Sequence, residues 1–176
     1  MEDLSLHILD IVENATNAGA TLVSVSIEED SKKDLLEITI KDNGSGMDAQ
    51  SLNGIRDPFF TSRSTRRVGL GVPLLEAAAR EAGGHLRVDS QPGRGTEVRA
   101  TFQAGHIDRK PLGDMGATLI SLIMGNPEVD FVYESNLNGK NTSLDTRSIK
   151  KEIEGVTTIT DPAVLKLIQD LVNDPE

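Results

Sequence analysis

The feature that most limits the fold of this chain is the order of helical and strand-like patterns in its first part. Twice, a stretch with apolar residues at helical spacing precedes two runs in which apolar and polar residues alternate. The helical stretches cover residues 4–18 and 72–82, and the alternating runs cover residues 23–27, 36–40, 86–88 and 96–102. Elements in this order pack as layers, so we expect an α+β fold, a two-layer sandwich of a mixed sheet with helices on one face.

The pattern changes near residue 105, and we expect residues 106–176 to form a small mixed α/β module appended to a domain of residues 1–105. Asn138-Gly139 lies between two short strand-like runs, and this dipeptide is a strong signal for a hairpin turn. The expected elements of this module are a mostly apolar helix, a hairpin and two capped helices, at residues 114–124, 129–145, 145–154 and 161–172.

Composition excludes several classes of function. The formal net charge of −10, with 3% aromatic residues and no Trp, argues against a protein that binds nucleic acid through phosphates or base stacking. The absence of cysteine excludes disulfides and thiolate chemistry. The apolar stretch Met115–Met124 is well short of the ~20 residues that a membrane-spanning helix needs. Because the acidic start also lacks the order of a secretion signal, we expect a cytoplasmic protein.

The first candidate motif is Asp42-Asn43-Gly44-Ser45-Gly46, which directly follows a predicted strand. Taken by itself, it fits a hairpin turn as well as a ligand site. In a ligand site, Asp42 offers a carboxylate acceptor, and Gly44 and Gly46 allow the backbone to approach a planar ligand closely.

The second motif, Gly69-Leu70-Gly71, leads into the helix predicted to begin at Val72. Glycines at a helix N-terminus allow an anion to approach the free N–H groups of the first turn. The lysine and the spacing of the Walker and dinucleotide-binding motifs are absent, and an ordinary loop is the alternative interpretation.

The third part is a polar face on the first predicted helix, formed by His7, Asp10, Asn14 and Asn17. A solvated surface is the simple interpretation, but these residue types are poor helix formers compared with Lys, Glu or Gln. Asp10 and Asn14 lie one turn apart, where a carboxylate and an amide oxygen can share a magnesium ion and its water.

These parts occur in one order together with a late Gly-x-Gly-Thr at residues 93–96, and this combination resembles the GHKL ATPases. That family includes gyrase-type topoisomerases, heat-shock chaperones, sensor histidine kinases and MutL mismatch-repair proteins. Residues 10–21 look like the MutL version of the helix, whereas residues 57–63 and 68–75 look like histidine-kinase and anti-sigma-kinase sequences. The resemblance extends over residues 4–103 and implies the Bergerat fold with an ATP and Mg²⁺ site.

The resemblance also implies roles for single residues. Asp42 matches the carboxylate that accepts a hydrogen bond from the adenine amino group, and Thr96 matches the threonine joined to it through water. Asn14 matches the magnesium-binding asparagine. The other implied nucleotide contacts flank the base, the phosphates or the short lid of residues 61–68, and are Asn17, Gly44, Gly46, Met47, Phe60, Arg63, Gly69, Leu70, Gly71 and Val72.

Asp10 stands where hydrolysing and serine-phosphorylating members have a general-base glutamate, and where most histidine kinases have asparagine. The resemblance therefore implies that Asp10 can activate water or a hydroxyl, although its side chain is one methylene shorter. We interpret His7 as a capping or surface histidine rather than as a group that orients Asp10.

The functional expectation is a regulatory kinase-like ATP-binding module of the histidine-kinase or anti-sigma serine-kinase type, without a histidine phosphoacceptor domain. Residues 106–176 are expected to engage a protein partner, and residues 114–124 are expected to pack internally or in a homodimer. The alternative is a non-catalytic ATP sensor that controls its partner through binding alone. A DNA-repair-like ATPase is less consistent with the acidic charge.

Overall fold

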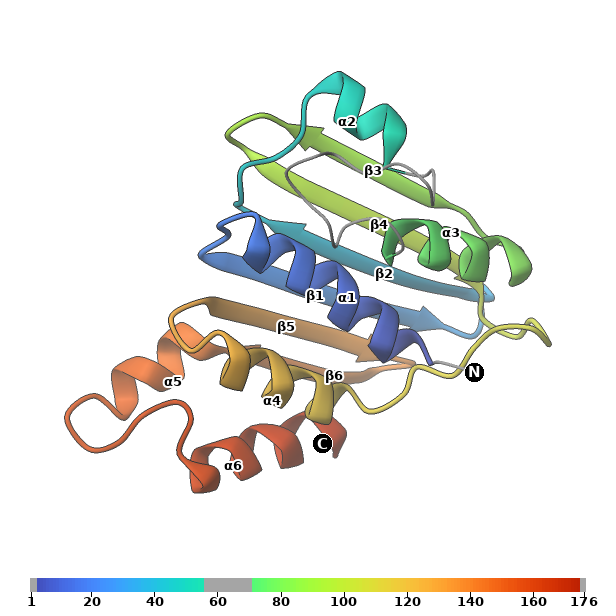
Figure 1. Ribbon diagram of the computed structural model, residues 1–176. Helices are drawn as coiled ribbons and strands as arrows, with labels where there is room; N and C mark the ends of the chain where they lie inside the picture. Colours follow the sequence, from blue (N-terminus) through green and yellow to red (C-terminus); the bar gives the residue numbers. More distant parts are fainter. Residues whose placement is uncertain (1–2, 56–70, 175–176) are drawn as a thin grey trace.

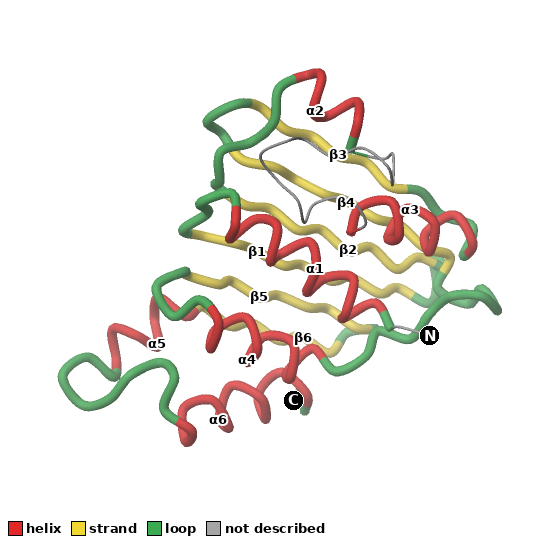
Figure 2. Tube along the Cα trace, in the orientation of Figure 1, coloured by secondary structure: helices red, strands yellow, loops and turns green. Residues whose placement is uncertain are grey.

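The computed structural model describes residues 3–55 and 71–174, and these residues are built around a six-stranded sheet (Figures 1 and 2). The strand order is β3-β4-β2-β1-β5-β6. The strands are β1 (Leu22–Asp30), β2 (Leu35–Asp42), β3 (Leu86–Gln91), β4 (Gly95–Gln103), β5 (Asp130–Leu137) and β6 (Lys140–Asp145). The β1–β5 pair is parallel and the other neighbouring pairs are antiparallel, so the sheet is mixed.

Helices cover one face of this sheet. They are α1 (Leu4–Asn17), α2 (Ala49–Gly54), α3 (Gly71–Glu81), α4 (Met115–Gly125), α5 (Thr146–Glu152) and α6 (Pro162–Asn173). Figure 2 shows α1 over the middle of the sheet, between α3 and α4, and α6 packs against α4. The predicted α+β class with a mixed sheet and helices on one face is confirmed.

Aspartate caps set most of the helix starts. A carboxylate at the N-cap accepts a backbone N–H of the first turn and so satisfies a donor that the helix leaves without a partner. Among the described residues, five helices begin in this way, after Asp3, Asp48, Asp114, Asp145 and Asp161. The starts that the sequence predicted near residues 145 and 161 are therefore confirmed.

The hydrophobic core lies between the helices and the inward rows of the strands. The apolar face predicted for α1 is buried, and it comprises Leu4, Ile8, Ile11, Val12 and Ala15. Alternate residues of β1 and β2 face this helix, since each strand shows the burial pattern of one buried and one open face. Phe131 and Tyr133 of β5 belong to the same core.

The C-terminal strands continue the sheet of the N-terminal part. β5 lies parallel to β1 with Leu22 opposite Asp130, and β6 follows it after the turn at Asn138 and Gly139. Both turn residues have positive φ angles, +54° and +93°, as the predicted hairpin requires. The sequence suggests a separate module for these strands, whereas the backbone of β5 pairs with β1, which would otherwise be an edge, and β6 pairs with β5. The division at residue 105 stays a prediction.

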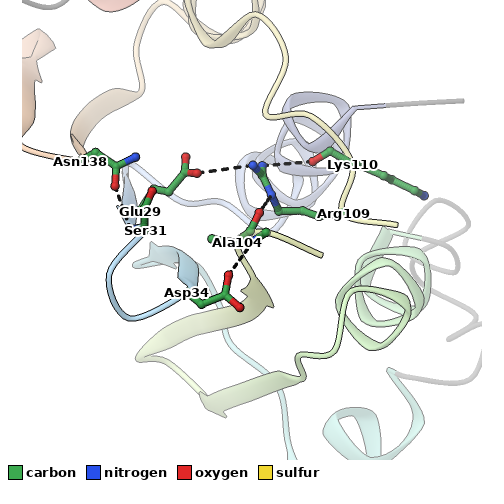
Figure 3. A network of polar contacts seen from close by, with 8 residues as sticks. Glu29, Ser31, Asp34, Ala104, Arg109, Lys110 and Asn138 are labelled. Atoms are coloured by element: carbon green, nitrogen blue, oxygen red, sulfur yellow. Dashed lines mark hydrogen bonds and ion pairs between the residues drawn. The ribbon is translucent and has the colours of Figure 1, made fainter. Parts of the chain in front are cut away.

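A polar network fastens these parts together at one end of the sheet (Figure 3). Arg109, in the segment after β4, donates from Nε to the carbonyl of Ala104 at 2.6 Å and pairs with Glu29 of β1 at 3.4 Å. The side chain of Asn138 accepts from the N–H of Ser31 at 2.8 Å. The β1–β2 turn, the segment after β4 and the β5–β6 turn are thereby held in fixed positions.

Candidate functional site

Asp42 ends the inward row of β2, after Leu36, Ile38 and Ile40. Its carboxylate is half-buried, and one oxygen accepts from the N–H of Gly44 at 2.8 Å. Burial raises the pKa of the Asp42 carboxyl above its ordinary value, and the N–H groups of Gly44 and Thr96 partly oppose this rise. The strand end therefore presents a fixed carboxylate acceptor toward the helical side of the sheet.

The packing of the backbone itself requires a glycine at position 46 and leaves little space at position 44. Gly46 has a φ of +68°, and a Cβ there would overlap the carbonyl of Gln91 in the β3–β4 turn. At Gly44 a Cβ would lie 3.0 Å from Oδ1 of Asp42 and 3.1 Å from the carbonyl of Ala18. The sequence explained these glycines by close approach of a ligand, and the structure adds close approach of the chain to itself.

Asn43, which the sequence interpretation did not single out, ties this loop to the start of β1. Its Oδ1 accepts from the N–H groups of Thr21 and Leu22 at 2.8 and 3.0 Å, and its Nδ2 donates to Oγ1 of Thr21 at 2.9 Å. An Asn directly after a strand commonly bonds to backbone in this way, so the signal was present in the sequence.

Thr96 lies opposite Asp42 on β4, and Ser90 lies opposite Thr96 on β3. The two hydroxyl oxygens are 2.8 Å apart, and Oγ of Ser90 also accepts from the N–H of Met47 at 2.9 Å. Sequence reasoning missed Ser90. The signal was its parity, because Ser90 is in the same alternating row as the inward-facing Leu86 and Val88.

The polar residues of α1 meet the start of α3. Gly71 is the first residue of α3 and is buried, and a Cβ there would lie 3.3 Å from Nδ2 of Asn14 and 3.6 Å from Cβ of Asp10. Asp10 and Asn17 are exposed and Asn14 is half-buried. The helix therefore places an amide and a carboxylate beside the positive end of α3.

The two halves of the candidate site are joined through the end of α1. Ser45, in the loop after Asp42, donates its N–H to the carbonyl of Ala18 at 3.0 Å. The Asp42 loop, the last turn of α1 and the entrance of α3 are thus contiguous. Phe60, Arg63, Gly69, Leu70 and the predicted lid of residues 61–68 lie outside the described residues.

Three other candidates have defined positions. Val72 is 2% exposed and packs in the core, so its backbone rather than its side chain faces the helix entrance, and Met47 is half-buried at the edge of the core. His7 is 2% exposed, so the expectation of a surface or capping histidine is wrong. Helix α1 packs against both α3 and α4, so more of its surface is covered than that of a helix lying alone on a sheet.

The profile of the histidine kinase-, DNA gyrase B- and HSP90-like ATPases matches residues 2–106. This match spans more than half of the chain, and the chain belongs to this family, which is the GHKL family that the motifs resembled. None of the helices within residues 3–55 and 71–174 has the length and apolar character needed to cross a bilayer.

Among curated proteins, the sensor protein kinase FleS of Pseudomonas aeruginosa is 38% identical over 89 residues, which cover 51% of this chain and 22% of FleS. The signal transduction histidine-protein kinase AtoS of Escherichia coli is 35% identical over 102 residues, covering 57% of this chain and 16% of AtoS. The chain spans less than a quarter of the length of these relatives. Its ATPase domain resembles the corresponding part of sensor histidine kinases.

Two solved structures share the fold. The N-terminal domain of a DNA repair protein has a TM-score of 0.55 at 15% identity, covering 82% of this chain and 53% of that one. The Aquifex aeolicus MutL ATPase domain complexed with ADP has a TM-score of 0.50 at 22% identity, covering 88% and 68%. At these identities the likeness shows the fold alone.

Proposed function

We propose that this protein binds ATP with Mg²⁺ and acts as a regulatory kinase-like module. The observation that carries the proposal is the contiguity of three features in one place: the strand-end carboxylate of Asp42, the polar face of α1 and the entrance of α3. A purine nucleotide needs an acceptor for its base and positive or metal-bound groups for its phosphates. The acceptor for the base lies near Ala18 at the end of α1, and the groups for the phosphates lie further back along the helix, near Asn14 and Asp10.

For the base, Asp42 is the proposed reader of the adenine amino group. An ionised carboxylate is an acceptor without a donor, so it matches the adenine N6 amino group and opposes the carbonyl that guanine carries at the same position. The bond from Gly44 to one carboxylate oxygen holds the other oxygen in a defined direction. We therefore expect ATP to bind much more tightly than GTP.

For the phosphates, Asn14 is the proposed ligand of Mg²⁺. The Asn14 side chain is half-buried, and its amide oxygen fits an ion that takes few protein oxygens and obtains its other ligands from water and phosphate. When bound, the ion offsets the negative charge of the phosphates. The first-turn N–H groups of α3, beginning at Gly71, face the same region and favour an anion.

Asp10 is the proposed general base. It lies one turn before Asn14 and is exposed, so a water or hydroxyl group can approach its carboxylate. In serine transfer, Asp10 accepts the hydroxyl proton while the oxygen attacks the γ-phosphorus and ADP leaves. In hydrolysis, a water molecule takes the place of the hydroxyl. The similarity to sensor kinases favours a phosphotransfer role, with the acceptor carried by a protein partner.

A non-catalytic ATP sensor remains the second candidate, because Asp10 is shorter than the glutamate of the hydrolysing family members. Both candidates propose that residues 106–176 connect ATP binding to a partner. A chain of contacts at the start of β5 supports this connection. Asp130 donates its N–H to the carbonyl of Thr21, and the side chain of Thr21 is bonded to Asn43 in the loop after Asp42.

The experiment that tests the proposal is a calorimetric titration with ATP and GTP, each with and without Mg²⁺, followed by an assay of phosphate release. The proposal expects Mg²⁺-dependent binding of ATP and weak or no binding of GTP. Equal affinity for the two nucleotides would refute the adenine assignment. An unchanged affinity after removal of Mg²⁺ would refute the role of Asn14 as a metal ligand.

A further inference from the structure

Ser90 is the one strand residue whose hydroxyl is bonded both to the loop after Asp42 and to Thr96, within the part of the chain that the structure describes. We propose that Ser90 is a positioning residue that makes Thr96 an acceptor toward the purine and so strengthens selection of adenine. This inference rests on the proposed function, because it assigns a role within the same nucleotide site.

The inference begins with the number of bonds that a serine hydroxyl can form. It has one hydrogen to donate and two lone pairs that accept. Oγ of Ser90 accepts from the N–H of Met47 at 2.9 Å and donates to the carbonyl of Gly95 at 3.0 Å. Its single hydrogen is therefore in use, and one lone pair remains.

The remaining lone pair decides the orientation of the neighbouring hydroxyl. Oγ1 of Thr96 lies 2.8 Å from Oγ of Ser90, and Ser90 has no second hydrogen to donate. Because the Gly95 carbonyl can only accept, we assign the hydrogen of Ser90 to it, and in this proposal Thr96 donates its own hydrogen to Ser90. The Thr96 oxygen then has only its two lone pairs left for other neighbours, so it acts toward them as an acceptor.

The register of the sheet places this acceptor next to the carboxylate. Ser90 is opposite Thr96, and Thr96 is opposite Asp42, so the three side chains form one row on the inward face of three adjacent strands. Asp42 and Thr96 together offer acceptors without donors. The adenine amino group, or a water bonded to it, is a donor and fits this row, whereas a carbonyl at the same purine position does not.

Removal of the Ser90 hydroxyl changes this preference. In Ser90→Ala, the hydroxyl of Thr96 loses its partner and is free to rotate, so that its hydrogen can turn toward the ligand. A purine with a carbonyl at position 6 then finds a donor in the site. The N–H of Met47 also loses its acceptor, and the loop after Asp42 becomes less firmly held.

The test compares ATP with inosine triphosphate, which differs from ATP by a carbonyl in place of the 6-amino group. Affinities for both are measured by calorimetry for the wild type, Ser90→Ala, Ser90→Thr and the control Ser26→Ala, which removes a half-buried serine hydroxyl from β1. We expect Ser90→Ala to lower the ATP-to-inosine-triphosphate affinity ratio about tenfold, the scale of one mispaired polar contact. Ser90→Thr restores a hydroxyl and is expected to keep the ratio, as is Ser26→Ala.

The outcomes are distinguishable from failure of the proposed function. If the wild type prefers ATP and Ser90→Ala weakens both nucleotides equally, Ser90 has only a structural role and the inference is wrong. If the wild type binds neither nucleotide, the proposed function and the inference fail together. Should Ser90→Ala not fold, Ser90→Cys provides the milder change, because a thiol is a weak donor and acceptor, and the ratio must again fall.

Discussion

Replacing Asp42 by asparagine is the sharpest test of the nucleotide site. The two side chains have nearly the same shape, and the asparagine carbonyl can still accept from the N–H of Gly44, which lies 2.8 Å from Oδ1 of Asp42. The group that changes is the other oxygen, which becomes an NH₂ donor. The new NH₂ group then faces the adenine amino group, so two donors oppose each other and the amino group has lost its acceptor.

The expected loss follows from the burial of this contact. A mispaired polar group that is shielded from water costs about 1–3 kcal/mol, which corresponds to roughly 5- to 150-fold weaker binding of ATP. Folding is not expected to suffer. Burial raises the pKa of the Asp42 carboxyl, which means that the folded state favours the neutral form. The stability that this carboxyl contributes at low pH is therefore lost as the pH rises through the raised pKa, and a neutral asparagine avoids this loss.

The assay is calorimetric titration with ATP and Mg²⁺, together with thermal unfolding at pH 7. Asp170→Asn is the matched control, since it makes the same change in charge at an exposed position on α6. We expect Asp42→Asn to bind ATP weakly while its melting temperature equals or exceeds that of the wild type. ATP affinity equal to that of Asp170→Asn would refute the assignment of Asp42 as the base acceptor.

Three further predictions concern stability and turnover. Gly46→Ala is expected to destabilise the fold by roughly 2–4 kcal/mol, whereas Gly93→Ala, with a φ of +75° but open space around its Cβ, costs about 1 kcal/mol; equal melting temperatures in calorimetry would contradict the overlap with Gln91. Backbone N–H donors lower the pKa of the capping carboxyls of Asp48, Asp114 and Asp161. Their contribution to stability is therefore full above the ordinary value of 3.8 and is lost as the pH falls through the lowered values. We expect acid to lower the melting temperature of Asp114→Asn less than that of the wild type, and an equal decrease would disprove this. Asp10→Asn is expected to abolish phosphate release while ATP still binds, and unchanged turnover would refute the role of Asp10 as the general base.

Local signals in the sequence were sufficient for the helices and strands. Apolar spacing placed the buried face of α1, and strand alternation placed the inward rows of β1 and β2, since these periodicities follow from backbone geometry alone. The aspartate before Pro162 predicted a helix start because capping involves groups within a few residues of each other. The order of the motifs was also sufficient to indicate the ATPase family.

Local patterns did not predict contacts between distant segments, and only the family resemblance implied that Thr96 lies near Asp42. The parallel pairing of β5 with β1 joins residues far apart in the chain, and no local pattern states which strand edge another strand will join. The burial of His7 was also not predicted, because a helical pattern in the sequence does not show what packs around the helix. The row formed by Ser90, Thr96 and Asp42 depends on the register of three strands. A change of register by one residue would give every residue of a strand a different neighbour, and the sequence does not state the register.

The sequence by itself determined the kinds of elements, the helix starts near residues 145 and 161 and the family, because periodicity, capping and motif order can be read along the chain. The tertiary structure decided which of these residues meet. It placed the carboxylate of Asp42 in one row with Thr96 and Ser90, and it brought Asp10 and Asn14 to the entrance of α3. Those meetings arise from the pairing of strands and the packing of helices over one shared core, and such contacts exist only in the folded chain.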